Sequence, residues 1–207
     1  MTDIAADYTA VLPLFGRRAF VLDLRGHGRS AAPATGYDLA DLSTDVGAVV
    51  DAVTDGPVHV VTFSRGTTYG IAWAIENAAR VRSLAIGDYI PEERALPESI
   101  SRRLLDGRWR GTPVSERLDE DAALKTFRAA HGRSFWQALA GLQLPLLVVR
   151  SGDSILVSDE DWSRYETLFP SAQLVELDDS PHDIFRPDRA RFPRLVREHV
   201  DRADKDR

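Results

Sequence analysis

The sequence has no cysteine among its 207 residues. Disulfides, thiol catalysis and cysteine-based metal sites are therefore excluded. No apolar run approaches the roughly 20 residues of a membrane span, and the first residues lack the basic and apolar regions of a secretion signal. Basic residues are also not in excess, because 32 acidic side chains face 26 basic ones and give a net charge of −6. We expect a soluble, cytoplasmic protein with no membrane association and no nucleic-acid partner.

The composition that is present fits one globular domain. Hydrophobic residues make up 43% and charged residues 28% of the chain. A chain of this length can bury a sizeable core without dividing into several domains. We therefore interpret residues 1–207 as a single unit.

Short apolar segments alternate with helical periodicity along the chain. The helical segments are residues 36–53, 67–79, 158–169 and 187–200, and Ser158 with Asp161 has the spacing of a capping box. Alternating strands and helices favour an α/β fold, a three-layer αβα sandwich around a mostly parallel sheet. Residues at about 91–144 interrupt the pattern as a polar, mostly helical insertion. Its scattered apolar anchors are Leu104, Leu105, Trp109, Leu124, Phe127, Phe135, Trp136 and Leu139. The segments that predict strands are 19–24, 57–63, 81–87, 144–150 and 172–177.

The stretch VHVVTFSRGTTYG, residues 58–70, places Ser64 between a predicted strand and a helix that begins with small residues. A serine on such a sharp turn is lifted clear of the sheet, and the backbone N–H of Arg65 then points toward an oxyanion. The alternative is that Ser64 only caps the helix. Thr62 stands where the G-x-S-x-G elbow has glycine. The motif by itself leaves both interpretations open.

Two further stretches extend the pattern, VLDLRGHGRSAAP at 21–33 and DDSPHDIFRPDRARF at 178–192. Together with the turn at Ser64, they resemble the α/β-hydrolase fold superfamily, of the serine hydrolase type. The resemblance implies a tight turn behind the active site at 21–33, in which His27 is structural. It also implies that His182, after the last strand, is the general base.

The acid of the implied Ser-His-Asp triad has two candidates. Asp88 ends the strand at 81–87, and Asp153 follows the strand at 144–150. Both keep the chain order of the family, serine then acid then histidine. Asp153 lies one residue before the family's usual position, which falls on Ser154, and a shift of one residue in a turn re-aims the carboxylate. We prefer Asp88 slightly.

The resemblance begins partway into the family's fold. About three strands and a His-Gly loop, which supplies a second oxyanion donor, have no counterpart before residue 19, and residues 3–18 resemble the family's first helix. Either the recorded start lies downstream of the true one, or the protein is a natural short form. The strands at 19–24 and 57–63 must then pair directly or leave a gap with unpaired backbone groups. An unpaired edge strand near the start can recruit a second copy of the chain, which leaves a homodimer open.

The resemblance implies a serine hydrolase that cleaves an ester or related acyl bond of a small, moderately apolar substrate through an acyl-enzyme. The insertion at about 91–144 corresponds to the family's cap. Neither a metal nor an organic cofactor is implied. The alternative is a non-catalytic or degenerate hydrolase-like module that binds a ligand. Thr62, the displaced acid and the absent oxyanion loop favour this alternative.

Overall fold

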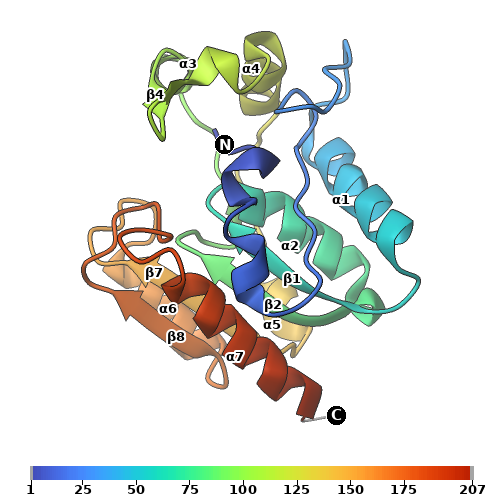
Figure 1. Cartoon of the computed structure of the whole chain (residues 1–207), viewed down its shortest axis with the longest axis vertical. Coiled ribbons are helices and arrows are strands. Elements are labelled where there is room, and N and C mark those ends of the chain that lie inside the picture. The colour runs from blue at the N-terminus through green and yellow to red at the C-terminus, as the bar shows by residue number, and fades with distance from the viewer. Residues whose placement is uncertain (1, 206–207) are drawn as a thin grey trace.

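A four-stranded parallel sheet forms the centre of the protein (Figure 1). The computed structural model describes residues 2–205. The strand order is β1-β2-β7-β8, and each neighbouring pair is parallel. These four strands confirm four of the five strand predictions. Their bounds are Val58–Phe63 for β1, Val81–Gly87 for β2, Leu146–Ser151 for β7 and Gln173–Leu177 for β8.

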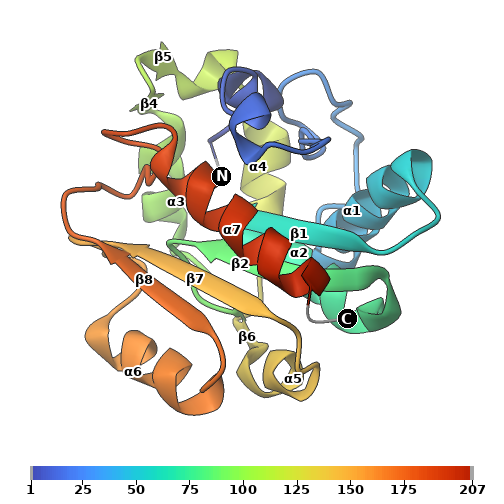
Figure 2. The same cartoon turned by 60° about the horizontal axis from the view of Figure 1, so that its bottom comes forward.

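Helices cover both faces of this sheet (Figure 2). Alternate residues of β2 and β7 enter two separate cores, Ala85 and Leu147 on the face of α7 and Leu84 and Val148 on the other. This alternation follows from the period of two along a strand, and it confirms the predicted αβα sandwich. The helices are α1 (Leu39–Val53), α2 (Gly66–Glu76), α5 (Trp136–Gly141), α6 (Asp159–Leu168) and α7 (Arg191–Lys205), with η3 (Ala78–Arg80) after α2.

Side-chain caps fix where two of these helices begin. Asp38 accepts a hydrogen bond from the backbone N–H of Asp41 and starts α1. Ser158 does the same for Asp161 and starts α6, and each pair completes a capping box. The predicted cap at Ser158 is therefore confirmed. The last helix was expected from residue 187 and begins instead at Arg191.

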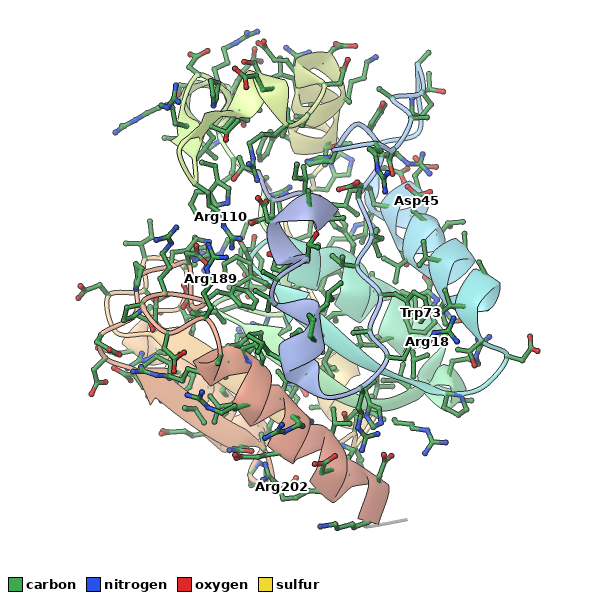
Figure 3. The ribbon with its side chains drawn as sticks, in the orientation of Figure 1. Arg18, Asp45, Trp73, Arg110, Arg189 and Arg202 are labelled. Atoms are coloured by element: carbon green, nitrogen blue, oxygen red, sulfur yellow. The ribbon has the colours of Figure 1, made fainter. Side chains whose placement is uncertain are left out.

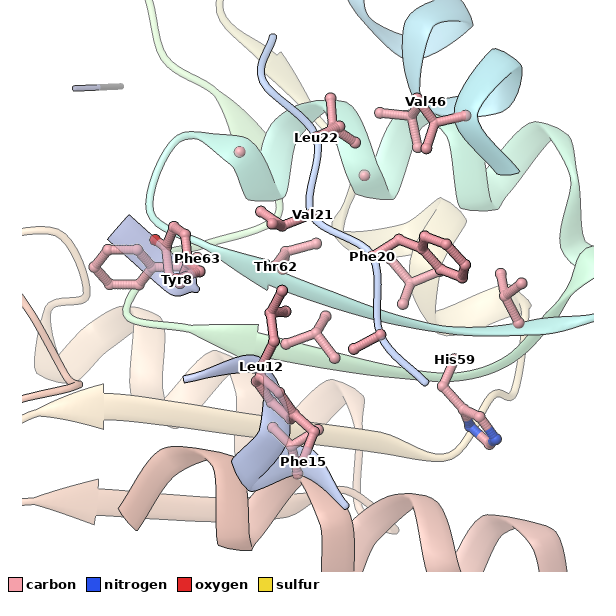
Figure 4. A pocket seen from close by; sticks show the side chains of 18 of the residues that line it. Tyr8, Leu12, Phe15, Phe20, Val21, Leu22, Val46, His59, Thr62 and Phe63 are labelled. Carbon is pink, nitrogen blue, oxygen red and sulfur yellow. The ribbon is translucent and has the colours of Figure 1, made fainter. Parts of the chain in front are cut away.

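The prediction of a strand at residues 19–24 is wrong. The segment is not part of any sheet, and within the described chain the backbone groups of residues 18–22 make no hydrogen bond. A cavity of about 850 Å³ separates the segment from β1, which leaves a gap in place of a pairing. Its walls come from α1, the N-terminal segment and α7 (Figure 4). Apolar content made the segment look like a strand, but a strand also needs a partner at ladder distance.

The gap leaves β1 as an edge strand. The N–H of Ser64 donates to the carbonyl of Gly87 across the ladder to β2. Because successive residues of a strand face opposite sides, the backbone groups of His59, Val61 and Phe63 point to the open side. Val61 is 40% exposed and Phe20, across the gap, is 50% exposed.

The N-terminal segment also departs from expectation. Residues 3–18 were compared with one helix, but they form two short 3-10 helices, η1 (Ala5–Tyr8) and η2 (Leu12–Phe15). Pro13 within η2 removes a backbone donor and disfavours a continuous α-helix. Val11 between them is buried against α7 and the sheet.

The cap insertion, residues 91–144, contains its own small core. Leu105, Val114 and Phe127 are buried there, whereas Leu104, expected as an anchor, is 43% exposed. Its last helix, α5, packs instead into the core of the main body through Trp136. The remaining elements are α3 (Glu98–Leu105), η4 (Val114–Glu116), α4 (Glu120–Arg128), the strand pair β3 (Glu92–Glu93) and β6 (Arg133–Ser134), and the hairpin β4 (Arg108–Trp109) and β5 (Thr112–Pro113).

Among the helices of residues 2–205, none combines the length and the apolar character that crossing a bilayer requires.

A buried histidine lies on the inner face of α7. His199 is 4% exposed, and among the described side chains its Nε2 is one of two buried polar atoms without a partner. Burial, followed by the charge of Arg202, lowers the pKa of His199 from its ordinary 6.5 to about 4. The imidazole is therefore neutral in the folded protein near neutral pH.

We predict that His199 makes the fold sensitive to mild acid. Between pH 6.5 and 4, His199 binds a proton in the unfolded chain but stays neutral in the folded protein. The contribution of His199 to the free energy of unfolding is therefore fully present above pH 6.5 and is lost as the pH falls from 6.5 to about 4. Denaturant midpoints measured from pH 7 to 4.5 should decline less for His199→Leu than for the wild type. The exposed His131→Leu serves as the control and should follow the wild type.

Candidate active site

Ser64 occupies the turn between β1 and α2. Its backbone φ is 52°, a left-handed value that a residue with a Cβ adopts only under constraint. Two backbone hydrogen bonds hold it, from Ser64 N–H to Gly87 and from Thr67 N–H to Ser64, each 2.9 Å long. The side chain stands at the carboxyl end of the sheet, as an elbow serine requires.

Thr62 fits at this turn because Gly70 lies opposite it. A Cβ built on Gly70 would come 2.6 Å from Cγ2 of Thr62, which is closer than real Cβ atoms approach. The Thr62 hydroxyl is also used, because it donates to the carbonyl of Ala85 at 3.1 Å and accepts from Thr67 at 3.1 Å. The glycine that makes room at this turn is therefore Gly70 on helix α2, and not a residue of strand β1.

The structure brings His182 to Ser64. Ser64 Oγ lies 3.0 Å from His182 Nε2, although 118 residues separate them along the chain. His182 Nδ1 lies 2.7 Å from Asp88 Oδ2. With the proton on Nδ1, the imidazole donates to Asp88 and accepts from the Ser64 hydroxyl, which is the tautomer a general base requires.

Asp88 is the carboxylate that the structure places against His182. It is fully buried at the end of β2, with a φ of 45°. Oδ1 accepts from the backbone N–H of Ser151, and Oδ2 accepts from the Ser151 hydroxyl. Burial raises the pKa of Asp88, but hydrogen bonds from His182, Ser151 and Ser154 outweigh it and leave the pKa below its ordinary value. Asp88 is therefore ionised at neutral pH.

Asp153, the other candidate acid, lies away from this group. It is exposed in the turn after β7, and its carboxylate makes no hydrogen bond to His182. The turn is fixed by Gly152, whose N–H donates to Leu177 and whose α-carbon faces Asp178 so closely that a Cβ would lie 2.4 Å from its carbonyl oxygen. This contact directs the next side chain outward.

Arg65 contributes to the site in two ways. Its backbone N–H opens the first turn of α2 and donates to no protein atom in the described chain, which leaves it available to an anion at Ser64. Its guanidinium is buried, donating to the Tyr69 hydroxyl and the Arg94 carbonyl and lying 5.1 Å from the Phe127 ring centroid. The side chain therefore ties the cap insertion to the turn that carries Ser64.

The stretch at residues 21–33 is a scaffold. His27 is buried and pairs with Leu118 of the cap insertion in an isolated bridge. Gly26 and Gly28 have φ values of 75° and 51°, and added Cβ atoms would meet Ala122 and Asp23 at 2.4 Å. The expected tight turn is therefore present and holds the cap insertion.

A second serine, histidine and carboxylate also lie in line, at the amino end of the sheet. His59 Nδ1 is 2.9 Å from Ser83 Oγ, and His59 Nε2 is 3.3 Å from Asp204. Ser83 is only 1% exposed, and so no substrate reaches its hydroxyl. This group joins the end of α7 to the sheet.

Three side chains at the site escaped the sequence reasoning. Ser151 binds Asp88, Phe63 stacks on His182 with centroids 5.1 Å apart, and Trp109 lies 6.3 Å from the same imidazole. Ser151 and Phe63 have a sequence signal, because both end strands at the edge that carries Ser64. Trp109 was expected only as an apolar anchor of the cap insertion, and its place beside His182 has no sequence signal.

Comparisons with known proteins match the fold of the chain. A family model described as the alpha/beta hydrolase fold matches residues 4–98. A stretch of 72 residues is 39% identical to the protein named carbamate hydrolase RutD from Variovorax paradoxus (strain S110). That stretch is 34% of this chain and only 27% of the relative, about a quarter of its length.

Solved structures extend the likeness to the whole chain. An E-2-(acetamidomethylene)succinate hydrolase superposes with a TM-score of 0.76 at 20% identity, over 97% of this chain and 88% of that one. An enol-lactonase from Burkholderia xenovorans LB400 gives a TM-score of 0.74 at 20% identity, again over 97% and 88%. At this identity the likeness concerns the fold.

We predict that Gly70→Ala destabilises the protein by about 1–3 kcal/mol, because the new methyl group overlaps Thr62 Cγ2. Thr62→Ser removes that methyl group and keeps the hydroxyl, and so the double variant should recover most of the loss. Gly141→Ala is the control, since a Cβ there meets nothing within 4 Å. Urea unfolding of the four proteins measures the effect. Equal stability of Gly70→Ala and Gly141→Ala would contradict the proposed fit.

Proposed function

We propose that this chain, which has the fold of the α/β hydrolases, is a serine hydrolase that cleaves an ester or related acyl bond. The observation that carries the proposal is the continuous hydrogen-bond chain from Ser64 through His182 to Asp88, with distances of 3.0 Å and 2.7 Å. Hydrolase names among the relatives support the same reaction class.

In the proposed reaction, Ser64 Oγ attacks the acyl carbonyl while its proton passes to His182 Nε2. Asp88 stabilises the imidazolium that forms. The backbone N–H of Arg65 holds the oxyanion of the tetrahedral intermediate. His182 then returns the proton to the leaving group, and an acyl-enzyme remains. Water then gives a proton to His182 and attacks the acyl carbon. His182 returns that proton to Ser64 Oγ as the bond between the acyl carbon and the serine breaks, and the carboxylic acid leaves.

The surroundings of His182 favour a small, moderately apolar substrate. Phe63 stacks on the imidazole and Trp109 approaches it from the cap insertion. Phe185 packs edge-on against Phe63 with centroids 5.6 Å apart. These aromatic side chains give an apolar acyl group a surface to pack against beside the imidazole.

The rival function is a hydrolase-like module that binds a ligand without turnover. One observation favours it: Arg65 is the only oxyanion donor that we assign, and loss of one donor lowers turnover by about 10²–10³ in other serine hydrolases. The rival predicts a folded protein whose serine does not react. The proposal predicts a slow but reactive serine.

We predict that a fluorophosphonate probe labels the folded protein at Ser64, because His182 can take the hydroxyl proton. Labelling should vanish in Ser64→Ala and fall at least about 10³-fold in His182→Gln. Intact mass and peptide mapping measure the extent and the position of labelling.

The matched control is Ser83→Ala, since Ser83 also contacts a histidine but is buried. Its labelling should equal that of the wild type. A wild-type sample that is folded by circular dichroism and stays unlabelled for hours would overturn the hydrolase proposal in favour of the binding module.

A second prediction separates the two candidate acids. Asp88→Asn should lower the labelling rate about 10³–10⁴-fold, because the amide cannot hold the required tautomer of His182 or stabilise its charge. Asp153→Asn should change the rate less than about twofold, since that carboxylate is exposed and does not contact His182. The ratio of the two labelling rates is the measurement. Loss of activity in Asp153→Asn alone would assign the acid to the turn after β7.

A further inference from the structure

A strained turn lies at the tip of the cap hairpin, which we define as Arg108–Pro113. Strands β4 and β5 are joined by Arg110 and Gly111, whose φ values are 49° and 85°. Two-residue turns with both φ values positive favour Asn-Gly, and arginine is an unusual first residue. A left-handed residue with a long side chain persists only where its surroundings hold it.

The Arg110 side chain leaves the hairpin and enters the main body (Figure 3). Its guanidinium lies 2.9 Å from Asp183 Oδ1 and 3.4 Å from Asp3 Oδ1, and it is 11% exposed. It also lies over the rings of Tyr8 and Phe185, at 5.3 Å and 5.9 Å from their centroids. The hairpin is thus joined to the body by a nearly buried ion pair and two aromatic contacts.

The partner of Arg110 is the residue directly after His182. Asp183 is 8% exposed and belongs to the histidine loop, residues 178–190, between β8 and α7. The neighbour of Arg110 lies over the same loop: Trp109 donates from Nε1 to Asp3 at 2.9 Å and places its ring 6.3 Å from His182. One hairpin therefore lies against the His182 ring and forms an ion pair with the side chain of the next residue in the loop.

We propose that Arg110 is a positioning residue that fixes the cap hairpin to the histidine loop through its ion pair with Asp183. This restraint, which we call the latch, keeps His182 between Phe63 and Trp109 and in line with Ser64. The kinetic part of this inference rests on the proposed hydrolase function. The structural part, that Arg110 restrains the histidine loop, does not.

The chemistry of the pair explains why arginine is used. A nearly buried carboxylate is costly without a positive partner, and Arg110 pairs with both Asp183 and Asp3. Arg186 also lies 3.5 Å from Asp183. A planar guanidinium can reach two carboxylates and stack on rings at once, whereas the lysine ammonium offers a single point of charge. Arg110→Lys should therefore retain the contact with Asp183 and only part of the restraint.

The kinetic test compares Arg110→Met with Arg128→Met, a cap arginine that is 53% exposed and pairs with Glu98. With p-nitrophenyl butyrate, Arg110→Met should lower kcat about 10- to 100-fold with KM changed only a few-fold, because His182 is misaligned while the acyl site persists. Arg110→Lys should recover part of kcat. Arg128→Met should match the wild type. An unchanged kcat in Arg110→Met would overturn the inference even though the hydrolase proposal stands.

A double-mutant cycle tests whether Arg110 acts through Asp183. Asp183→Asn should itself lower kcat, and adding Arg110→Met to it should lower kcat by little more. If instead the two reductions in kcat multiply, the residues act independently, and the inference that Arg110 acts through Asp183 is wrong.

Hydrogen exchange decides the structural part whether or not the wild type turns over. In Arg110→Met, amides of both residues 108–113 and residues 178–190 should exchange faster, with α3 and α4 unchanged. If only the hairpin loosens and the histidine loop exchanges as in the wild type, Arg110 does not restrain that loop. A wild type that is inert toward both the ester and the fluorophosphonate would overturn the proposed function and leave this measurement to decide the latch.

Discussion

The hydrogen bonds that converge on Asp88 are the contacts on which the candidate site depends. A carboxylate with no exposure to solvent is stable only if its oxygens are satisfied, and here His182 and Ser151 satisfy them. Ser151 is in place because β7 pairs with β2, and His182 is in place because its loop follows β8 on the other side of β7. The strand order of the sheet therefore assembles the site, and the buried charge orients the imidazole.

Much of this arrangement could be predicted from sequence because it depends on local signals. Short apolar runs located all four strands of the sheet, and the order of Ser64, Asp88 and His182 at strand ends, together with the family resemblance, indicated their convergence. The choice between Asp88 and Asp153 could not be made firmly. It depends on how the turn after β7 is held, and the close packing of Gly152 on Asp178 is a contact between distant parts of the chain.

The failures share the same physical origin. Residues 19–24 have the composition of a strand, yet pairing depends on a neighbour that local pattern cannot report. The accommodation of Thr62 by Gly70 joins a strand to a helix, and the role of Trp109 depends on where the cap hairpin folds back. Each is decided by tertiary contact, which overrides the preference of the individual segment.

The three members of the hydrogen-bond chain differ in how firmly the sheet supports them. Asp88 follows β2, an interior strand with neighbours on both sides, whereas Ser64 follows β1 at the margin. Fraying of β1 is opposed by one ladder instead of two, and beyond it lies a void where a further strand would stand. The Ser64 hydroxyl is therefore carried by an edge strand whose free side faces a cavity, and a molecule bound along that side would steady the serine without contacting it.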